Sequence, residues 1–287
     1  MIVRGHESVL VQGITGKQGT FWAERMHEYG TKIIGGVNPK RAGEAHLGLP
    51  VWATAREAAR ETNIDATVMF VPPLGVKEAA LDAIEAGIGK IVCLTEHVPV
   101  HDTMYLLAAA RERGTQVLGP NTAGIVTTGE SFVGFMPAFN PRVFQPGKVG
   151  VISRSGSLGT LVCLNLAQAG LGISAFIGIG GDPIIGTSTR DALVALDQDP
   201  GTTAIALIGE IGGSMEEEAA DYARTMKKPI AAFIAGAASP PGKRMGHAGA
   251  IVTGDKGSHA GKTAALKAAG VAIAATPSGI ADALRDV

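Results

Sequence analysis

The sequence predicts two α/β domains, each built on a doubly wound parallel sheet. Short apolar runs alternate with alanine-rich helical stretches along the 287 residues, which is typical of parallel strands joined by crossover helices. Charges are sparse inside the later apolar runs, as expected for strands that helices cover on both faces. The alternation is interrupted once, over residues 129–147, and then restarts, which indicates two domains.

The first domain is predicted over residues 1–125. Its expected elements, in order, are strand 8–13, helix 19–30, strand 32–37, strand 66–72, helix 76–87, strand 90–95, helix 102–113 and strand 115–119. Gly30 and Gly87 close two of these helices, because glycine readily adopts the left-handed conformation that follows a helix.

A connector is predicted over residues 126–147, because GESFVGFMPAFNPRVFQPG (129–147) has three prolines and no hydrophobic period. The second domain is predicted over 148–287. Its expected elements, in order, are strand 148–153, helix 157–170, strand 173–180, helix 187–198, strand 203–209, helix 215–227, strand 229–236 and a last long helix.

Composition limits the environment and the partners of the protein. The formal net charge of −1 gives no reason to expect nucleic acid or an anionic membrane surface as a partner. No apolar run reaches the roughly 18 residues that span a bilayer, and the N-terminus lacks the hydrophobic region of a signal peptide. Cys93 and Cys163 lie in apolar contexts and are predicted as buried free thiols. We therefore expect a cytoplasmic protein.

A glycine-rich turn, GITGKQG (13–19), follows the first strand and opens the first helix. Such turns let backbone amides approach a phosphate at a helix N-terminus. The spacing differs from that of the dinucleotide fingerprint G-x-G-x-x-G, and the second strand is followed by Lys40 and Arg41 instead of an acidic residue. These cations suit a phosphorylated ribose or a pyrophosphate. A nucleotide-like ligand is therefore favoured, with a purely structural turn as the alternative.

Three segments of the second domain place small or polar residues at the ends of strands. SRSGS (153–157) offers hydroxyls and amides at a helix start, which suit either an N-cap or a phosphoryl group. GEIGG (209–213) brings Glu210 to the carboxyl end of a buried strand, where doubly wound sheets place ligands. GIGGDPIIG (178–186) is a further glycine-rich strand end.

His247 lies in the glycine-lined segment GKRMGHAGA (242–250), with Lys243 and Arg244 upstream. A structural histidine is the ordinary interpretation, but this loop leaves the ring accessible and offers charge compensation. Glu210 could accept a hydrogen bond from one ring nitrogen and leave the other nucleophilic toward a phosphoryl group. No histidine or cysteine pair has metal-ligand spacing here, so no metal is expected.

The segment GSHAGKT (257–263) is similar to the phosphate-binding P-loop G-x-x-x-x-G-K-[ST]. The first glycine of that motif would have to occupy position 256, which is Lys256. We therefore interpret the segment as a loop that leads into the last long helix.

Ordered motifs over nearly the whole chain resemble those of the α subunit of succinate–CoA ligase (succinyl-CoA synthetase). They are QGITGKQGTF (12–21), YGTKIIGGVNP (29–39), LTEHVP (94–99), GPNTAG (119–124), PGKVGVISRSG (146–156), GIGGDPI (178–184), IGEIGGSMEEEAA (208–220) and GKRMGHAGAI (242–251). The resemblance implies a Rossmann-like CoA-binding domain followed by a flavodoxin-like domain that carries a phosphorylated histidine. A nucleoside triphosphate would phosphorylate the histidine, the phosphoryl group would pass to a carboxylate, and the CoA thiol would attack the acyl phosphate.

The same resemblance implies roles for individual residues. His247 matches the phosphohistidine and Glu210 the glutamate that supports it, while a helix start is expected to hold phosphate through Ser155, Gly156 and Ser157. The residues that match CoA contacts are Thr15, Gly16, Lys17, Gln18, Arg41, Leu94, Thr95 and Glu96. In this family Mg²⁺ and ATP or GTP belong to an ATP-grasp domain on a separate β subunit, so activity is expected only in an αβ or α2β2 assembly.

The chain departs from the family pattern where acid and thiol should meet. The tyrosine that contacts the acid is replaced by Thr160 and the following glutamate by Leu161, and the cysteine of GPNCPG is replaced by Thr122. The family's CoA-site lysine corresponds to Arg41, preceded by Lys40. Succinate is the family default, with malate, citrate or another small acid as alternatives. A non-catalytic CoA-binding paralogue and a NAD-dependent dehydrogenase remain as other classes, the second disfavoured by the glycine spacing.

Overall fold

The computed structural model divides the chain into two compact units. It describes residues 1–240, 242–252 and 257–285. The first unit holds Val3–Phe135 and the short segment Ile184–Gly186, and the second holds Met136–Pro183 and the chain from Thr187 onward. The division after Phe135 falls within the segment expected to connect two domains.

The first sheet has the strand order β3-β4-β2-β1-β5-β6-β7. Its strands are β1 (Ser8–Gln12), β2 (Lys32–Val37), β3 (Ala45–His46), β4 (Leu49–Trp52), β5 (Ala66–Met69), β6 (Lys90–Cys93) and β7 (Gln116–Leu118). All pairs from β4 to β7 are parallel, while β3 pairs antiparallel with β4. Without β3, the chain order of the strands across the sheet is 3-2-1-4-5-6, the order of nucleotide-binding sheets.

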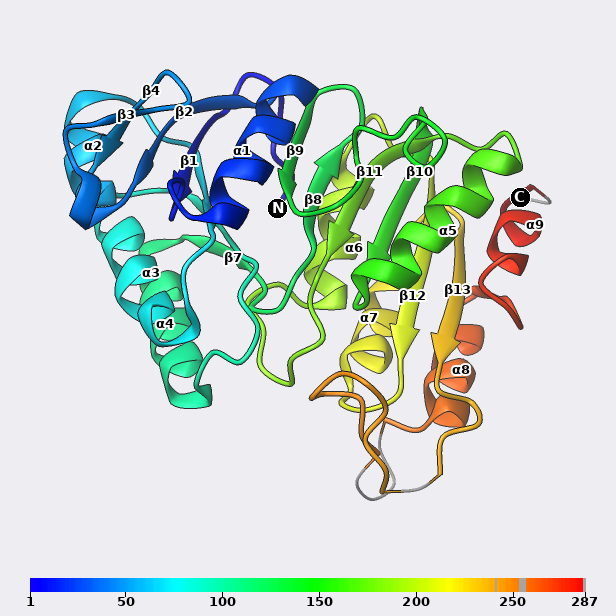
Figure 1. The fold of residues 1–287 in the computed structure, drawn as a ribbon. Coiled ribbons are helices and arrows are strands. Elements are labelled where there is room, and N and C mark those ends of the chain that lie inside the picture. The colour runs from blue at the N-terminus through cyan, green and yellow to red at the C-terminus, as the bar shows by residue number, and fades with distance from the viewer. Residues whose placement is uncertain (241, 253–256, 286–287) are drawn as a thin grey trace. The chain divides into compact units, whose positions relative to one another are not determined.

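Helices of the first unit follow its strands as the alternation predicts. They are α1 (Lys17–Tyr29), α2 (Ala55–Glu61), α3 (Val76–Glu85) and α4 (Val100–Arg113), with short 3₁₀ turns η1 (Pro39–Arg41) and η2 (Pro73–Gly75). Helix α3 contacts both α2 and α4, so these helices lie side by side (Figure 1). Helix α1 ends at Gly30, whose φ of 110° gives the left-handed cap that the sequence predicted.

The second unit is built on parallel strands in the order β14-β13-β12-β10-β11. They are β10 (Pro146–Ser153), β11 (Ile173–Gly178), β12 (Ala204–Glu210), β13 (Ile230–Ala235) and β14 (Ala272–Ile273). In chain order this arrangement is 2-1-3-4-5, which is the flavodoxin-like order. Its helices are α5 (Gly156–Gln168), α6 (Thr189–Gln198), α7 (Met215–Ala223), α8 (His259–Ala268) and α9 (Gly279–Arg285).

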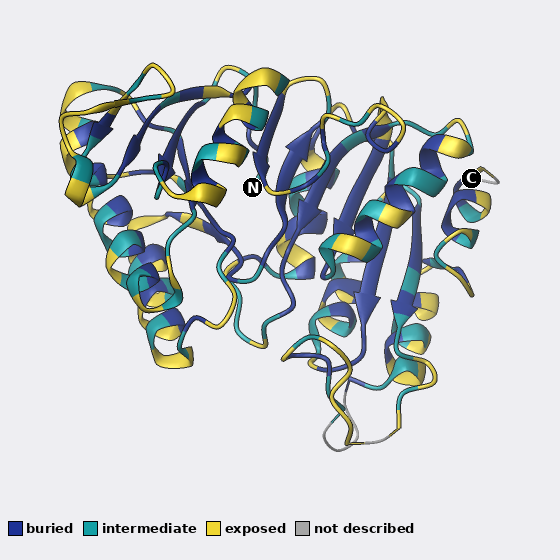
Figure 2. Cartoon of the chain, in the orientation of Figure 1, coloured by how far each residue is buried: buried dark blue, intermediate teal, exposed yellow. Residues whose placement is uncertain are grey.

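These helices cover the second sheet on both faces. Helices α5 and α9 contact each other on one face, and α7 contacts both α6 and α8 on the other (Figure 1). The strands of both sheets are largely buried, whereas exposed residues gather on the outer sides of the helices (Figure 2). The predicted α/β fold class, with a Rossmann-like first sheet and a flavodoxin-like second sheet, is therefore confirmed.

Two segments differ from the sequence-based expectation. The stretch 42–65, for which no element was predicted, contains β3, β4 and α2, because strands of two to four residues are too short to show a period. The expected connector begins inside an antiparallel hairpin of β8 (Gly124–Thr127) and β9 (Ser131–Gly134). These strands are buried throughout, so their residues lack the alternation of apolar and polar side chains that marks a strand.

Two further expectations concern membrane-spanning helices and the thiols. Within the described residues, no helix combines the length and the apolar character needed to cross a membrane. Cys93 and Cys163 are buried and neither takes part in a disulfide, as the sequence predicted. Burial raises the pKa of the Cys163 thiol far above its ordinary value.

Candidate functional site

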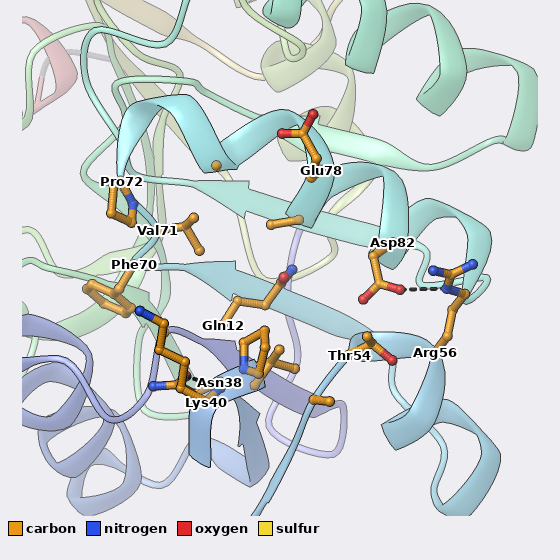
Figure 3. Close-up of a pocket in the computed structure, with 16 residues that line it drawn as sticks. Gln12, Asn38, Lys40, Thr54, Arg56, Phe70, Val71, Pro72, Glu78 and Asp82 are labelled. Carbon is orange, nitrogen blue, oxygen red and sulfur yellow. Dashed lines mark hydrogen bonds and ion pairs between the residues drawn. The ribbon is translucent and has the colours of Figure 1, made fainter. Parts of the chain in front are cut away.

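A cavity of about 660 Å³ lies in the first unit, where β1, β2 and β5 end (Figure 3). The strand order reverses between β1 and β5, and ligands of doubly wound sheets bind at such a switch point. Gln12, Asn38 and Phe70 approach the cavity from the ends of these three strands, and Lys40 lines it from η1. Arg56 and Asp82 line its far end and form an ion pair with Nε and Oδ1 2.6 Å apart.

The glycine-rich turn between β1 and α1 borders this cavity, and packing explains part of its composition. Gly13 has φ +80°, and a Cβ there would lie 2.3 Å from the carbonyl oxygen of Phe70. A Cβ on Gly19 would lie 2.1 Å from the carbonyl oxygen of Gly13. Gly16 is less constrained, since its Cβ would lie 3.3 Å from the same oxygen. Close backbone packing therefore requires the outer two glycines, whereas Gly16 leaves the N-cap of α1 uncovered.

The predicted CoA residues of the turn lie at the start of α1. Thr15 accepts a hydrogen bond from Asn38 Nδ2 at 2.5 Å, which ties the turn to the end of β2. Lys17 is exposed as the first residue of α1, and Gln18 lines a second cavity of about 460 Å³. Asn38 was not among the residues predicted from the sequence, although an asparagine directly after a parallel strand was a visible signal.

The remaining predicted CoA residues are divided. Leu94 and Thr95 line the same 460 Å³ cavity as Gln18. Glu96 is exposed and lines neither of these two cavities. Arg41 turns to Glu44, with Arg41 NH2 and Glu44 Oε2 2.6 Å apart, and this hydrogen-bonded carboxylate raises the pKa of the Arg41 guanidinium. Lys40 therefore occupies the place at the larger cavity that was expected for Arg41.

In the second unit, His247 and Glu210 meet at the carboxyl end of the sheet. Glu210 is the last residue of β12, and its Oε2 lies 2.8 Å from His247 Nδ1. A carboxylate can only accept, so Nδ1 carries the proton and a neutral ring has its lone pair on Nε2. Strand order reverses between β10 and β12, so this pair lies at the switch point of the second sheet.

Arg154 supplies the cation of this site. It follows β10, is 3% exposed, and places Nε 3.3 Å from Glu210 Oε1, while its NH1 donates to the carbonyl oxygen of Gly212 at 3.3 Å. Lys243 and Arg244, the cations predicted for this role, are both exposed. The arginine inside SRSGS was the signal for this role, since a charged residue at the end of a buried strand needs a partner.

Two glycines make room for the site. A Cβ on Gly181 would lie 2.4 Å from Cγ of His247, and a Cβ on Gly249 would lie 2.7 Å from NH2 of Arg154. The amide of Gly249 donates to the carbonyl oxygen of Gly181 at 3.1 Å, which joins the histidine segment to the loop after β11. The imidazole ring of His247 therefore packs against the backbone of Gly181, in the glycine-rich strand end GIGGDPIIG.

The start of α5 has the geometry of an ordinary N-cap. Ser155 Oγ accepts from the amide of Leu158 at 3.4 Å, and Ser157 is exposed. Thr160 Oγ1 donates to the carbonyl oxygen of Gly156 at 2.8 Å, so the hydroxyl proton of Thr160 is already used inside the helix. Among the described residues, no group of three or more His, Cys, Asp or Glu side chains could hold a metal ion.

Together these features define an α/β protein with a nucleotide-type cavity in one unit and a carboxylate-supported histidine in the other. Residues 5–97 match the CoA binding domain family and residues 152–272 match the CoA-ligase family. The ADP-forming succinate–CoA ligase subunit alpha 2 of Archaeoglobus fulgidus is 45% identical over 287 residues, covering 100% of this chain and 99% of the relative. The chain therefore belongs to the succinate–CoA ligase α-subunit family.

Related proteins act on more than one acid. The malate–CoA ligase subunit alpha of Methylorubrum extorquens is 42% identical over 284 residues, 97% of this chain and 95% of the relative. A solved structure of ATP citrate lyase from Methanothrix soehngenii, in complex with citrate and coenzyme A, matches with a TM-score of 0.92 and 25% identity. The match covers 100% of this chain, which spans 50% of the length of that solved chain.

Proposed function

We propose that this chain is the α subunit of an acid–CoA ligase in which His247 carries the phosphoryl group. The observation that supports this most strongly is the contact of 2.8 Å between His247 Nδ1 and Glu210 Oε2 at the switch point of the second sheet. A histidine held in this tautomer presents Nε2 as a nucleophile, and the family match over 152–272 makes phosphoryl transfer the fitting reaction.

The proposed reaction has three transfers. Nε2 of His247 attacks the γ-phosphorus of the nucleoside triphosphate, and the bond to the leaving nucleoside diphosphate breaks. A carboxylate oxygen of the acid then attacks the same phosphorus, which frees the imidazole and gives an acyl phosphate. Finally the CoA thiol, losing its proton, attacks the acyl carbon and releases phosphate. Glu210 stabilises the ring while it carries positive charge, and Arg154 Nε lies 3.3 Å from Oε1, the carboxylate oxygen of Glu210 that does not contact His247.

Coenzyme A is proposed to bind the first unit, at the two cavities beside the glycine turn. The uncovered N-terminus of α1 and the Lys40 ammonium suit phosphate groups, and the mainly apolar walls suit the adenine and pantetheine parts. The proposed contacts are Thr15, Gly16, Lys17, Gln18, Lys40, Arg41, Leu94, Thr95 and Glu96. Of these, Glu96 and Arg41 have the weakest support, because one is exposed and the other is paired with Glu44.

A partner subunit is proposed to bring Mg²⁺ and ATP or GTP, since the related proteins are named as α subunits. Succinate is the first candidate for the acid, and malate and citrate follow because relatives and a structural neighbour act on or bind them. The helix start at Ser155, Gly156 and Ser157 is proposed to hold the phosphoryl group. Thr160 lies one turn into α5, where a family tyrosine contacts the acid.

The test is phosphorylation of the chain in complex with its β subunit. With Mg²⁺ and γ-labelled ATP or GTP, we expect an acid-labile, base-stable label on this chain. His247→Ala should carry no label while its affinity for CoA stays within about twofold, because CoA binds the other unit. An unlabelled wild-type chain beside an active partner, or a labelled His247→Ala chain, would contradict the proposal, and the first outcome is expected of a non-catalytic CoA-binding paralogue.

The acid is identified with the same complex. CoA thioester formation is measured with succinate, malate and citrate at equal concentrations. Preference for succinate would mean that Thr160 and Leu161 are neutral replacements. Preference for another acid would assign the changed helix α5 to an altered acid site.

A further inference from the structure

Behind the His247 site lies a buried ion pair that the proposed reaction does not use. Glu216 on α7 and Lys262 on α8 are both 0% exposed, and Lys262 Nζ contacts Glu216 Oε2. Lys262 also lies 3.4 Å from Glu217 Oε2. Lys262 is the lysine of GSHAGKT, the segment that is similar to a P-loop. Its ammonium faces two carboxylates in the protein interior, so it is not available to a phosphate.

Stability alone does not explain why a protein contains a buried ion pair. Desolvation of two charges costs about as much as their attraction gains, and apolar residues of similar size are often equally stable. The second carboxylate oxygen of Glu216 indicates what this ion pair does. Glu216 Oε1 accepts a hydrogen bond, at 3.2 Å, from the backbone N–H of Glu210. Glu210 is the residue whose side chain holds His247.

The end of β12 explains why this N–H needs a side-chain acceptor. The register of β10 with β12 ends at Ser153 and Ile208, two residues before Glu210. The next amide, that of Ile211, donates to Ala235 on β13, and amides alternate sides along a strand. The N–H of Glu210 therefore points to the side where the ladder has stopped. A Cβ on Gly209 would lie 2.7 Å from Glu216 Oε1, so the backbone approaches this carboxylate closely.

We propose that Glu216 and Lys262 are positioning residues that fix the tautomer of His247. Lys262 holds one oxygen of Glu216, the other oxygen holds the backbone of Glu210, and the Glu210 carboxylate holds Nδ1–H of the imidazole. Lys262 and Arg154 also give each of the two buried carboxylates, Glu216 and Glu210, its own cation. The part of this inference that concerns catalysis rests on the proposed phosphoryl transfer, whereas the part that concerns the tautomer does not.

Two double variants test the proposal. E216Q/K262M and E216L/K262M both remove the ion pair of Glu216 with Lys262, and both leave Glu217 as the same remaining carboxylate. Only glutamine keeps an oxygen that can accept from the N–H of Glu210. The side-chain volumes are similar, so a difference between the two variants reports on this one hydrogen bond.

The primary readout is the ring ¹⁵N spectrum of His247 in the full chain, which separates the protonated from the unprotonated nitrogen. E216Q/K262M should keep the Nδ1–H form, and E216L/K262M should show a mixture of tautomers. In the complex with the β subunit, phosphohistidine formation should slow about tenfold in the leucine variant relative to the glutamine variant, with equal CoA affinity. Equal spectra and equal rates in both variants would overturn the proposal.

Gly209→Ala is the second variant, in case the leucine variant does not fold. It keeps Glu216 and Lys262 but pushes the carboxylate away from the N–H, so the tautomer should again become mixed. An unchanged spectrum in a folded Gly209→Ala chain would overturn the proposal. The ring spectrum does not depend on phosphorylation. A wild-type chain that is never labelled would therefore refute the proposed function, while the response of the spectrum still decides on the positioning residues.

Discussion

The two switch points of this molecule hold candidate sites of opposite construction. In the first unit a cavity of about 660 Å³ is bordered by a glycine turn, backbone amides and the ends of exposed side chains such as Lys40. In the second unit a single imidazole is held by Glu210, which is 8% exposed and is in turn paired with Arg154, which is 3% exposed. A site for a large ligand distributes its binding contacts over many residues. A site that holds one imidazole ring depends on each of the few side chains around it. Substitutions at the site of the second unit should therefore reduce its function far more than substitutions at the site of the first unit.

The largest expected effect follows from the loss of the buried cation. Arg154→Met leaves Glu210 as an unpaired buried charge, and breaking such a pair costs about 3 kcal/mol or more. We expect this loss in the free energy of unfolding, measured with urea on the full chain, together with the loss of most phosphohistidine formation. Adding Glu210→Gln should restore most of the stability but not the phosphorylation. A stable Arg154→Met chain with normal labelling would show that the second site is as tolerant as the first.

The second largest effect is expected from the single methyl group that Gly181→Ala adds beside His247. Gly181→Ala would place Cβ 2.4 Å from Cγ of His247, so the ring must move. A displacement of about 1 Å at a reacting group can cost about 100-fold in rate, and we expect a loss of this size in phosphohistidine formation. CoA affinity, measured by calorimetry, should not change. Gly201→Ala is the matched control in the same unit, because its Cβ would meet no atom closer than 3.4 Å. Equal rates of phosphohistidine formation in both alanine variants would contradict the role of Gly181 in positioning the His247 ring.

The contrast between the two sites also explains which parts of the molecule could be predicted from the sequence. The alternation of strands and helices predicted both sheets, and the glycine turn at 13–19 indicated the first candidate site, because these signals are local in the chain. His247 and Glu210 were paired from their own segments, a glycine-lined loop and the carboxyl end of a buried strand, and the resemblance to a family then implied their roles. The strands at 45–52 were missed because they are too short for a period.

The supporting residues of the second site were the hardest to predict. Arg154, Gly181, Glu216 and Lys262 come from separate segments and meet only when β10, β11, β12 and their helices are in place. The sequence carried a signal for Arg154, a charged residue directly after a predicted buried strand, whereas Glu216 and Lys262 lie in predicted helices, where charged residues are ordinary. Sequence alone cannot say which buried cation meets which carboxylate, since that depends on strand order. Here the order placed Arg154 on Glu210 and Lys262 on Glu216.

A third prediction concerns the first site. Asn38 donates from Nδ2 to Thr15 Oγ1 and accepts at Oδ1 from the amide of Lys40, so it ties the glycine turn to η1. Asn38→Ala should weaken CoA binding about tenfold, the effect of one or two hydrogen bonds. Phosphohistidine formation should remain normal. Asn63→Ala is the control, because Asn63 is an exposed residue of the same unit whose Nδ2 bonds Asp65. Equal CoA affinity in the two variants would remove Asn38 from the proposed site.

The smallest expected effect separates two neighbouring cations. Lys40 lines the cavity, whereas the guanidinium of Arg41 is engaged by Glu44, whose hydrogen bond raises the pKa of Arg41. An exposed ammonium near a phosphate contributes little and is screened by salt, so Lys40→Ala should weaken CoA binding about threefold at low ionic strength and less at high. Arg41→Ala should change it by less than that.

Glu44→Gln makes this comparison decisive. The variant frees Arg41 from its carboxylate partner without changing Lys40. If the ion pair keeps Arg41 away from the ligand, Glu44→Gln should tighten CoA binding, and adding Arg41→Ala should cancel the gain. A larger loss from Arg41→Ala than from Lys40→Ala in the wild-type background would instead mean that Arg41 leaves Glu44 when CoA binds. The exposed cations of the first site would then rearrange on binding, which the buried cations of the second site have no room to do.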